Sequence, residues 1–284
     1  MKIAKCLVTG GCGFIGGHVV EALLDAGHEV TVIDNLSSGR FRPSCEVITE
    51  DILTYNIKEK YDYVFHLAAL PSVQGSIDDP VVSHNANLTG TLCILEYCRR
   101  TGAKIIFSSS SAIYEGDILP TKEQHKKNPR SPYAIQKQMS EQYIRLYSEL
   151  YGIDYVNLRY FNVYGERAST EGSYPLVISL FLKQKTEGKP LTITNTGEQK
   201  RDFTYVKDVA QANLLAMRWG NGDYNIGAGS NYSVNEVAQM IGGDTVNVGE
   251  RKGEPFATLA DNSRAIKAGW KQSIALDEWI ESLV

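Results

Sequence analysis

The chain has 284 residues, 43% of them hydrophobic and 22% charged, a composition typical of a folded globular protein. Its formal net charge of -4 argues against the basic surface that nucleic-acid binding needs, and no apolar run reaches the roughly 20 residues of a membrane-spanning helix. None of its five cysteines forms a C-x-x-C pair, so we expect a reduced, cytoplasmic protein without disulfides or a metal site. Because a strand-like run follows Lys2 directly, we also expect no signal peptide.

The first half of the chain alternates apolar, strand-like runs with helix-like segments. Such alternation predicts an α/β fold, a doubly wound parallel sheet with helices on both faces. Gly27 and Gly102 follow two of the helix-like segments and can adopt the positive φ of a helix C-cap. The predicted strands are 3–8, 29–34, 45–50, 61–67, 103–108 and 153–159, and the predicted helices are 13–26, 81–100 and 133–151.

After about Glu166 this regular alternation ends. The sequence SVNE, from Ser233 to Glu236, has capping-box spacing and should open a helix. The remaining elements expected in this part are a helix at 174–187 and short strands at 191–194 and 223–226.

This change of pattern predicts two domains. We expect a larger domain at 1–165 and a smaller α/β lid at 166–284, with a segment at about 203–220 packing back on the larger domain. Open parallel sheets bind ligands at the carboxyl ends of their strands, so the lid should cover that edge.

The segment TGGCGFIG joins the first predicted strand to the first predicted helix. Gly10 permits a tight turn, Gly13 allows the backbone to approach a pyrophosphate, and Gly16 permits close packing of the helix. The N-terminal end of the helix would bind the phosphates. Asp34 ends the second strand, where its carboxylate can accept hydrogen bonds from both ribose hydroxyls of an adenosine. The loop therefore predicts a bound dinucleotide, NAD rather than NADP, although Arg40 nearby leaves NADP open.

Of the 16 tyrosines only Tyr133 has a lysine at Y-x-x-x-K spacing, Lys137. Ser131 and Pro132 suit the N-cap and first turn of a helix, so both side chains should share one helix face. A phenol has a pKa of about 10, and a neighbouring ammonium favours the phenolate, which can then act as a base nearer neutral pH. Taken alone, such a pair would more often be a coincidence on a helix surface.

The serine run in IIFSSSSAIY ends the strand that precedes this helix. A hydroxyl there could bridge a substrate oxygen and Tyr133, although four serines could equally line a polar rim of the sheet. The glycine loop, the acid, the serine and the Tyr–Lys pair, in this order, form a specific combination of cofactor-binding and acid–base groups.

This combination resembles the extended short-chain dehydrogenase/reductase family, in the nucleotide-sugar epimerase branch that includes the UDP-glucose (UDP-galactose) 4-epimerases. The resemblance covers nearly the whole chain and implies a Rossmann-type sheet that binds NAD, a C-terminal substrate-binding lid and a UDP-sugar substrate. It also implies a homodimer paired through helices 81–100 and 133–151, although their apolar residues could simply belong to the core. The matching motifs are TGGCGFIG, VIDNLSSG, EDI, HLAA, NLTGT, SSSSAIY, YAIQK, RYFNVYG, QKRDFTYVKDV, ERKGEP and LADNSRA.

The resemblance assigns roles to residues at the matching positions. The implied catalytic residues are Ser110, Tyr133 and Lys137, with Ser111 as the rival serine. Further implied cofactor-binding residues, besides the three glycines of the loop, are Phe14, Ile15, Asp34, Asn35, Asp51, Ile52, Leu67, Ala68, Ala69, Asn87 and Phe161. Further implied substrate-binding residues are Asn162, Val177, Ile193, Arg201, Arg251 and Thr258, with the two arginines on the pyrophosphate.

The resemblance alone leaves the reaction open, because epimerases, dehydratases, decarboxylases and reductases share this scaffold. Dehydratases of the family carry Asp-Glu at the positions of Ser111 and Ala112, and decarboxylases carry a glutamate at that of Ala112. Alanine cannot transfer a proton, so the residues favour 4-epimerisation, in which NAD takes a hydride and returns it in each turnover. Two alternatives stay open: a nucleotide-sugar reductase or dehydrogenase with an exchangeable cofactor, and a non-catalytic NAD-binding regulator.

Thr258 stands where epimerases of this family carry either a bulky or a small residue. A small side chain leaves space beside the sugar. We therefore expect UDP-GlcNAc and UDP-GalNAc to be tolerated in addition to UDP-glucose and UDP-galactose, while the base and sugar are not fixed by the sequence.

Overall fold

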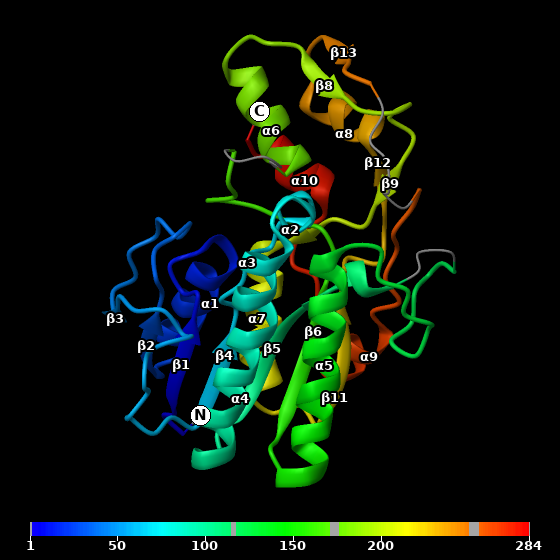
Figure 1. Cartoon of the computed structure of the whole chain (residues 1–284). Helices are drawn as coiled ribbons and strands as arrows, with labels where there is room; N and C mark the ends of the chain where they lie inside the picture. Colours follow the sequence, from blue (N-terminus) through cyan, green and yellow to red (C-terminus); the bar gives the residue numbers. More distant parts are fainter. Residues whose placement is uncertain (1, 115–117, 171–175, 250–255, 284) are drawn as a thin grey trace.

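A computed structural model describes residues 2–114, 118–170, 176–249 and 256–283. Its largest element is a seven-stranded sheet whose neighbouring strands pair in parallel (Figure 1). The strand order β11-β6-β5-β4-β1-β2-β3 starts in the middle, winds to one edge and then crosses to the other. This is the doubly wound, Rossmann-type arrangement, so the predicted fold is confirmed. The strands are β1 (Lys5–Thr9), β2 (Glu29–Ile33), β3 (Glu46–Ile48), β4 (Tyr63–His66), β5 (Lys104–Ser110), β6 (Tyr155–Tyr160) and β11 (Gly222–Ile226).

Helices cover both faces of the sheet because successive strand residues point to opposite sides and both sides are apolar. In β1, Cys6 and Val8 belong to the core that includes α1 and α7, whereas Leu7 belongs to the core formed with α4 and α5. In Figure 1, α4 and α5 run in front of the sheet. The helices are α1 (Phe14–Asp25), α4 (Gly90–Thr101), α5 (Pro132–Tyr151) and α7 (Val206–Ala216), with the shorter α2 (Val73–Asp78) and α3 (Pro80–His84) beside α5.

The helix ends follow the local sequence signals. Gly102 ends α4 with φ +75°, and Gly27, just beyond α1, has φ +80°. The side chains of Ser131 and Ser233 accept hydrogen bonds from first-turn N–H groups of α5 and α8 (Val234–Ile241), and the predicted capping box at Ser233 is present. These four predictions are confirmed.

A smaller group of elements forms the lid, which lies above the sheet in Figure 1. It contains β8 parallel to β13 and β9 antiparallel to β12, with α6 and α8 packed on each other. Two further short strands, β7 and β10, pair between the lid and the sheet. The bounds are β7 (Val163–Tyr164), α6 (Val177–Thr186), β8 (Leu191–Ile193), β9 (Lys200–Arg201), β10 (Thr204–Tyr205), β12 (Tyr232–Ser233), α8 (Val234–Ile241), β13 (Thr245–Asn247) and α10 (Leu276–Glu281). A further short helix, α9 (Ser263–Lys267), packs on β11 of the main sheet.

The placement of one predicted strand was wrong. Strand 223–226, expected in the lid, is β11, and it pairs in parallel with β6 to complete the main sheet. A strand as short as β11, with the sequence GDYNI, carries no local signal for the sheet that it joins, because that choice depends on tertiary packing, here on β6 and α9. The domain boundary after 165 stays a prediction, and the start of the predicted helix 174–187 lies outside the described residues.

Candidate active site

The glycine loop has the close packing that its sequence predicts. Gly10 has φ +74°, and an added Cβ would lie 2.6 Å from the backbone nitrogen of Ala68. An added Cβ at Gly16 would overlap the carbonyl oxygen of Gly10, whereas at Gly13 it would meet only that oxygen, at 3.2 Å. The loop is therefore packed against the sheet and open on its Gly13 side, at the N-terminus of α1. This geometry fits a dinucleotide pyrophosphate carried by Gly13, Phe14 and Ile15.

The carboxylate of Asp34 lies directly beside this loop. Its Oδ2 accepts from the backbone N–H of Cys12 at 2.9 Å and its Oδ1 from that of Leu36 at 2.8 Å. These bonds orient the carboxylate and leave further lone pairs for a diol. Next to it, Asn35 Nδ2 donates to Asp51 Oδ2 at 2.9 Å, so two of the predicted adenosine-side residues support one another. The acceptor set fits the ribose of NAD.

The turn after β4, which contains Leu67, Ala68 and Ala69, forms the other wall of the predicted cofactor site. Asn87 holds this turn from behind: its Oδ1 accepts from Leu70 N–H at 2.7 Å, and its Nδ2 donates to Leu70 O at 3.2 Å. Asn87 lies in a π-helical turn, Asn85–Thr89, which interrupts the predicted helix 81–100. Its amide is thus paired within the protein, and a direct contact with the cofactor stays a prediction.

The side chains of Tyr133 and Lys137 share one face of α5, as their spacing predicts. Lys137 is 4% exposed, its Nζ donates to the carbonyl of Ser108 at 2.7 Å and lies 6.0 Å from the centroid of the Tyr133 ring. Burial lowers the pKa of Lys137 to about 8, and the charge of Glu141 opposes that shift. Burial raises the pKa of the Tyr133 phenol, and a hydrogen bond with the Ser110 side chain works against it. The lowering of the Tyr133 pKa that we expected from the Lys137 ammonium is therefore not seen in the protein alone.

Ser110 ends β5 and starts a 3₁₀ turn that continues through Ser111. Its Oγ accepts from the N–H of Ala112 at 3.2 Å, so its own proton is available to donate. The Ser110 side chain is also the one that lowers the pKa of the Tyr133 phenol, against the effect of burial, and this favours Ser110 over Ser111 as the serine that meets a substrate oxygen.

A buried ion-pair network behind these residues was missed by the sequence analysis. Glu141, one helical turn after Lys137, accepts from Ser109 Oγ at 2.6 Å and pairs with Arg159 of β6, with Oε2 and Nη2 2.6 Å apart. Both charged side chains are fully buried, and Arg159 also pairs with Asp223 of β11. The only local signal was the K-x-x-x-E spacing, which is common on helix surfaces.

The predicted substrate residues Asn162 and Thr258 are joined. Asn162 Nδ2 donates to Thr258 Oγ1 at 3.1 Å and to the carbonyl of Asp202 at 2.9 Å, and Asp202 N–H donates to Thr258 Oγ1 at 3.1 Å. Asp202 is fully buried and its carboxylate accepts three backbone N–H groups, while burial raises its pKa to about 6. Phe161, expected beside the nicotinamide, is 1% exposed in an apolar cluster, and a direct contact with the cofactor stays a prediction.

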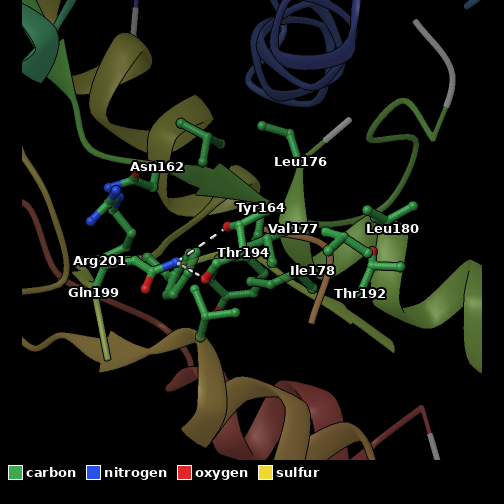
Figure 2. Close-up of a pocket in the computed structure, with 14 residues that line it drawn as sticks. Asn162, Tyr164, Leu176, Val177, Ile178, Leu180, Thr192, Thr194, Gln199 and Arg201 are labelled. Carbon is green, nitrogen blue, oxygen red and sulfur yellow. Dashed lines mark hydrogen bonds between the residues drawn. The ribbon is translucent and has the colours of Figure 1, made fainter. Parts of the chain in front are cut away.

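Asn162, Val177 and Arg201 line one pocket between the lid and the sheet (Figure 2). Figure 2 shows Asn162 beside Arg201, and Gln199 donating to the main chain and hydroxyl of Thr194. The remaining lining residues are mostly apolar and come from α6, β8 and the segments beside them. The pocket therefore suits a planar, partly apolar group with an anion near Arg201.

Ile193, another predicted substrate contact, is not among the residues that line this pocket. Ile193 is buried in the core, because residues of β8 alternate and its neighbours Thr192 and Thr194 face the pocket instead. A direct contact of Ile193 with the substrate stays a prediction. Arg251 lies outside the described residues.

No described helix combines the length and apolarity needed to cross a bilayer. Within the same residues, no three His, Cys, Asp or Glu side chains are grouped as metal ligands would be. The fold and the site together define a dinucleotide-binding enzyme of the short-chain dehydrogenase type, with a serine at the end of β5 and a Tyr–Lys pair on α5, which packs against that strand.

Comparison with known proteins gives the family. Residues 6–227 match the model of the NAD dependent epimerase/dehydratase family, and the chain belongs to this family. The predicted family, the use of NAD and the class of epimerase-like isomerases are confirmed.

Solved structures similar to the chain include two sugar-nucleotide epimerases. A UDP-N-acetylglucosamine 4-epimerase from Methanobrevibacter ruminantium, solved with UDP-N-acetylmuramic acid, is 40% identical with a TM-score of 0.94, covering 100% of this chain and 96% of that one. A UDP-glucose 4-epimerase from Thermotoga maritima, solved with UDP-glucose, is 36% identical with a TM-score of 0.93, covering 98% of this chain and 96% of that one. A UDP-N-acetyl-alpha-D-glucosaminuronate decarboxylase from Bacillus cytotoxicus is 36% identical over 84% of this chain and 79% of its own. The similar proteins thus share a scaffold and differ in sugar and reaction.

Proposed function

We propose that the protein is an NAD-dependent 4-epimerase that interconverts UDP-glucose and UDP-galactose, and also UDP-GlcNAc and UDP-GalNAc. The observation that carries the choice of reaction is the turn after Ser110. Ser111 and Ala112 occupy it, and Ala112 contributes only its backbone N–H to Ser110. A dehydratase or decarboxylase would need a carboxylate there, whereas epimerisation needs no acid–base group beyond Ser110, Tyr133 and Lys137.

Each of these residues has a defined task in this reaction. NAD supplies the acceptor for the C4 hydride and a positive charge that favours the phenolate. Tyr133 removes the proton of the C4 hydroxyl, and Ser110 donates a hydrogen bond to the same oxygen. Lys137 holds its ammonium beside the phenol and, by its bond to the Ser108 carbonyl, fixes α5 against the end of β5. The 4-keto sugar then rotates about its link to the diphosphate and accepts the hydride on its other face.

The lid anchors the nucleotide while the sugar turns. Arg201 lies at the polar end of the pocket with Asn162, and a guanidinium suits the diphosphate. The apolar lining from Leu176, Val177 and Val248 suits the flat faces of a base. An anchored diphosphate with a sugar free to rotate about its link is what the reaction requires.

We also propose a cytoplasmic homodimer. On α5, Ile135, Met139, Leu146 and Leu150 are exposed and share one face. In the other predicted pairing helix, 81–100, Leu88 and Leu95 are buried in the core. The exposed face of α5, with Val81 and Val82 of α3, supports pairing with a second copy.

Proton NMR of the sugar anomeric signals tests the reaction, with purified protein, UDP-glucose or UDP-GlcNAc and no added cofactor. We expect the galacto-configured product to appear. Turnover only after NAD or NADH is supplied, with net oxidation or reduction, would replace the epimerase by a reductase or dehydrogenase. No turnover under either condition would contradict the proposed substrates.

A further inference from the structure

Two connections that are distant in sequence meet on α1, the helix behind the glycine loop. One joins β2 to β3 and carries Phe41; the other follows β7 and carries Arg167. The ring of Phe41 packs on the helix so closely that an added Cβ at Gly17 would lie 2.7 Å from it. The Arg167 guanidinium lies 4.2 Å from the centroid of the same ring, a distance typical of a cation–π contact.

Arg167 is held in place by several groups at once. It donates to both carboxylate oxygens of Glu21 on α1, at 2.9 and 2.5 Å, and this contact lowers the pKa of Glu21. The preceding carbonyl, that of Glu166, is hydrogen-bonded to the ring of His18 at 3.0 Å. Arg167 itself has φ +66°, a conformation that non-glycine residues adopt only when their surroundings fix it.

Phe41 continues this chain of contacts into the glycine loop. Its N–H donates to the carbonyl of Cys12 at 3.0 Å, while the N–H of Cys12 donates to Asp34 at 2.9 Å. The packing is tight, since an added Cβ at Gly39 would lie 2.8 Å from the Cys12 backbone. One connection therefore holds Cys12 through its N–H and its carbonyl, in the middle of the loop that carries the pyrophosphate.

We propose that Arg167 and Phe41 are cofactor-positioning residues, which hold the β2–β3 connection closed on the glycine loop and retain NAD between turnovers. The carboxylate for the adenosine ribose, Asp34, begins this connection, and Cys12 lies in the loop itself. Release of the dinucleotide requires the connection to loosen, so the contacts of Arg167 set its rate. This role goes beyond the choice of sugar, because it concerns NAD alone and can be measured without a UDP-sugar.

The test measures the dissociation rate of radiolabelled NAD, chased with unlabelled NAD, from the wild type and from Arg167→Ala and Phe41→Ala. Loss of a closing contact appears mainly in the dissociation rate, and we expect a rise of about tenfold for Arg167→Ala. Arg264→Ala is a matched control, because that guanidinium lies 4.3 Å from the ring centroid of Tyr224 on β11, an edge strand that three strands separate from β1 and the glycine loop. It should leave the rate within about twofold of the wild type.

The two substitutions should also be less than additive, because they break one chain of contacts. Arg167→Lys, which retains the charge for Glu21 but loses the flat stacking surface, should give an intermediate rate. If Arg167→Ala and Arg167→Lys are folded and release NAD at the wild-type rate, the contacts only brace the start of the lid and the proposal is overturned. A result of this kind would leave the proposed epimerisation untouched, and failure to turn over UDP-sugars would leave the NAD measurement valid.

Discussion

The hydroxyl of Ser109 donates a hydrogen bond of 2.6 Å to the buried carboxylate of Glu141, which joins the end of β5 to α5 directly behind the catalytic residues. Ser109 precedes Ser110, and Glu141 lies one helical turn beyond Lys137. The bond therefore fixes the spacing between the two elements that must act on the same substrate oxygen.

Removing this bond should impair the reaction step more than substrate binding. For Ser109→Ala we expect kcat to fall about tenfold with little change in KM, since small misplacements of reacting groups are costly. Ser148→Ala, a hydroxyl change near the far end of the same helix, is the control. Steady-state kinetics with UDP-glucose give the answer, and an unchanged kcat in Ser109→Ala would show that the spacing is fixed by other contacts.

The pH dependence of the reaction should follow Lys137. Burial lowers its pKa to about 8, so the positive charge that Lys137 contributes to the site is lost as the pH rises through that value. We expect kcat to decline on the alkaline side from about pH 8. The Glu141 charge opposes this lowering of the Lys137 pKa, so a folded Glu141→Gln variant should show the decline of kcat at lower pH. A decline at the wild-type pH would contradict the connection between Lys137 and the alkaline loss of activity.

Burial of the same lysine should make the stability of the folded protein depend on pH in one direction. Between pH 8 and its ordinary pKa of 10.5, Lys137 binds fewer protons in the folded than in the unfolded state, so stability rises with pH in that window. The cost of the buried charge is fully present below pH 8. Lys137→Met should therefore be inactive yet melt at a higher temperature than the wild type at pH 7, and this advantage should shrink toward pH 10. Calorimetry across this range checks the trend, which a constant difference would refute.

Thr258 should affect binding through its hydroxyl as well as its size. Its Oγ1 accepts from both Asn162 and Asp202, so Thr258→Val leaves two donors unpaired at a cost of about 1–3 kcal/mol. We expect a raised KM in Thr258→Val and near-normal KM in Thr258→Ser, which keeps the oxygen. Thr258→Tyr should reduce the turnover of UDP-GlcNAc more than that of UDP-glucose. An equal loss of both activities would contradict the inference that a small residue here leaves space beside the sugar.

The proposed dimer can be tested on the exposed face of α5. Leu146, 44% exposed, is replaced by aspartate, which should prevent pairing and give the 31.4 kDa monomer in light scattering. Ile266→Asp on α9, an apolar position that is 52% exposed, should leave the wild-type mass unchanged. A monomeric wild type at micromolar concentration would contradict the dimer.

Some features could be predicted because the signal is local. The turn at Gly10, the helix starts at Ser131 and Ser233, and the shared face of Tyr133 and Lys137 depend on a few adjacent residues. In contrast, the place of β11 in the main sheet and the burial of Ile193 depend on which elements pack together. A strand shows that alternate residues face opposite sides, but its sequence does not say which side meets a ligand.

The sequence by itself determined the parallel sheet, the dinucleotide loop with its acid, and the order of serine, tyrosine and lysine, because each rests on backbone conformation or short-range spacing. Only the tertiary structure decided how these groups are supported. The contacts from Ser109 to Glu141 and from Phe41 to Arg167 join residues far apart along the chain. Their geometry and their electrostatic effect exist only once the sheet, the helices and the lid have packed and excluded water.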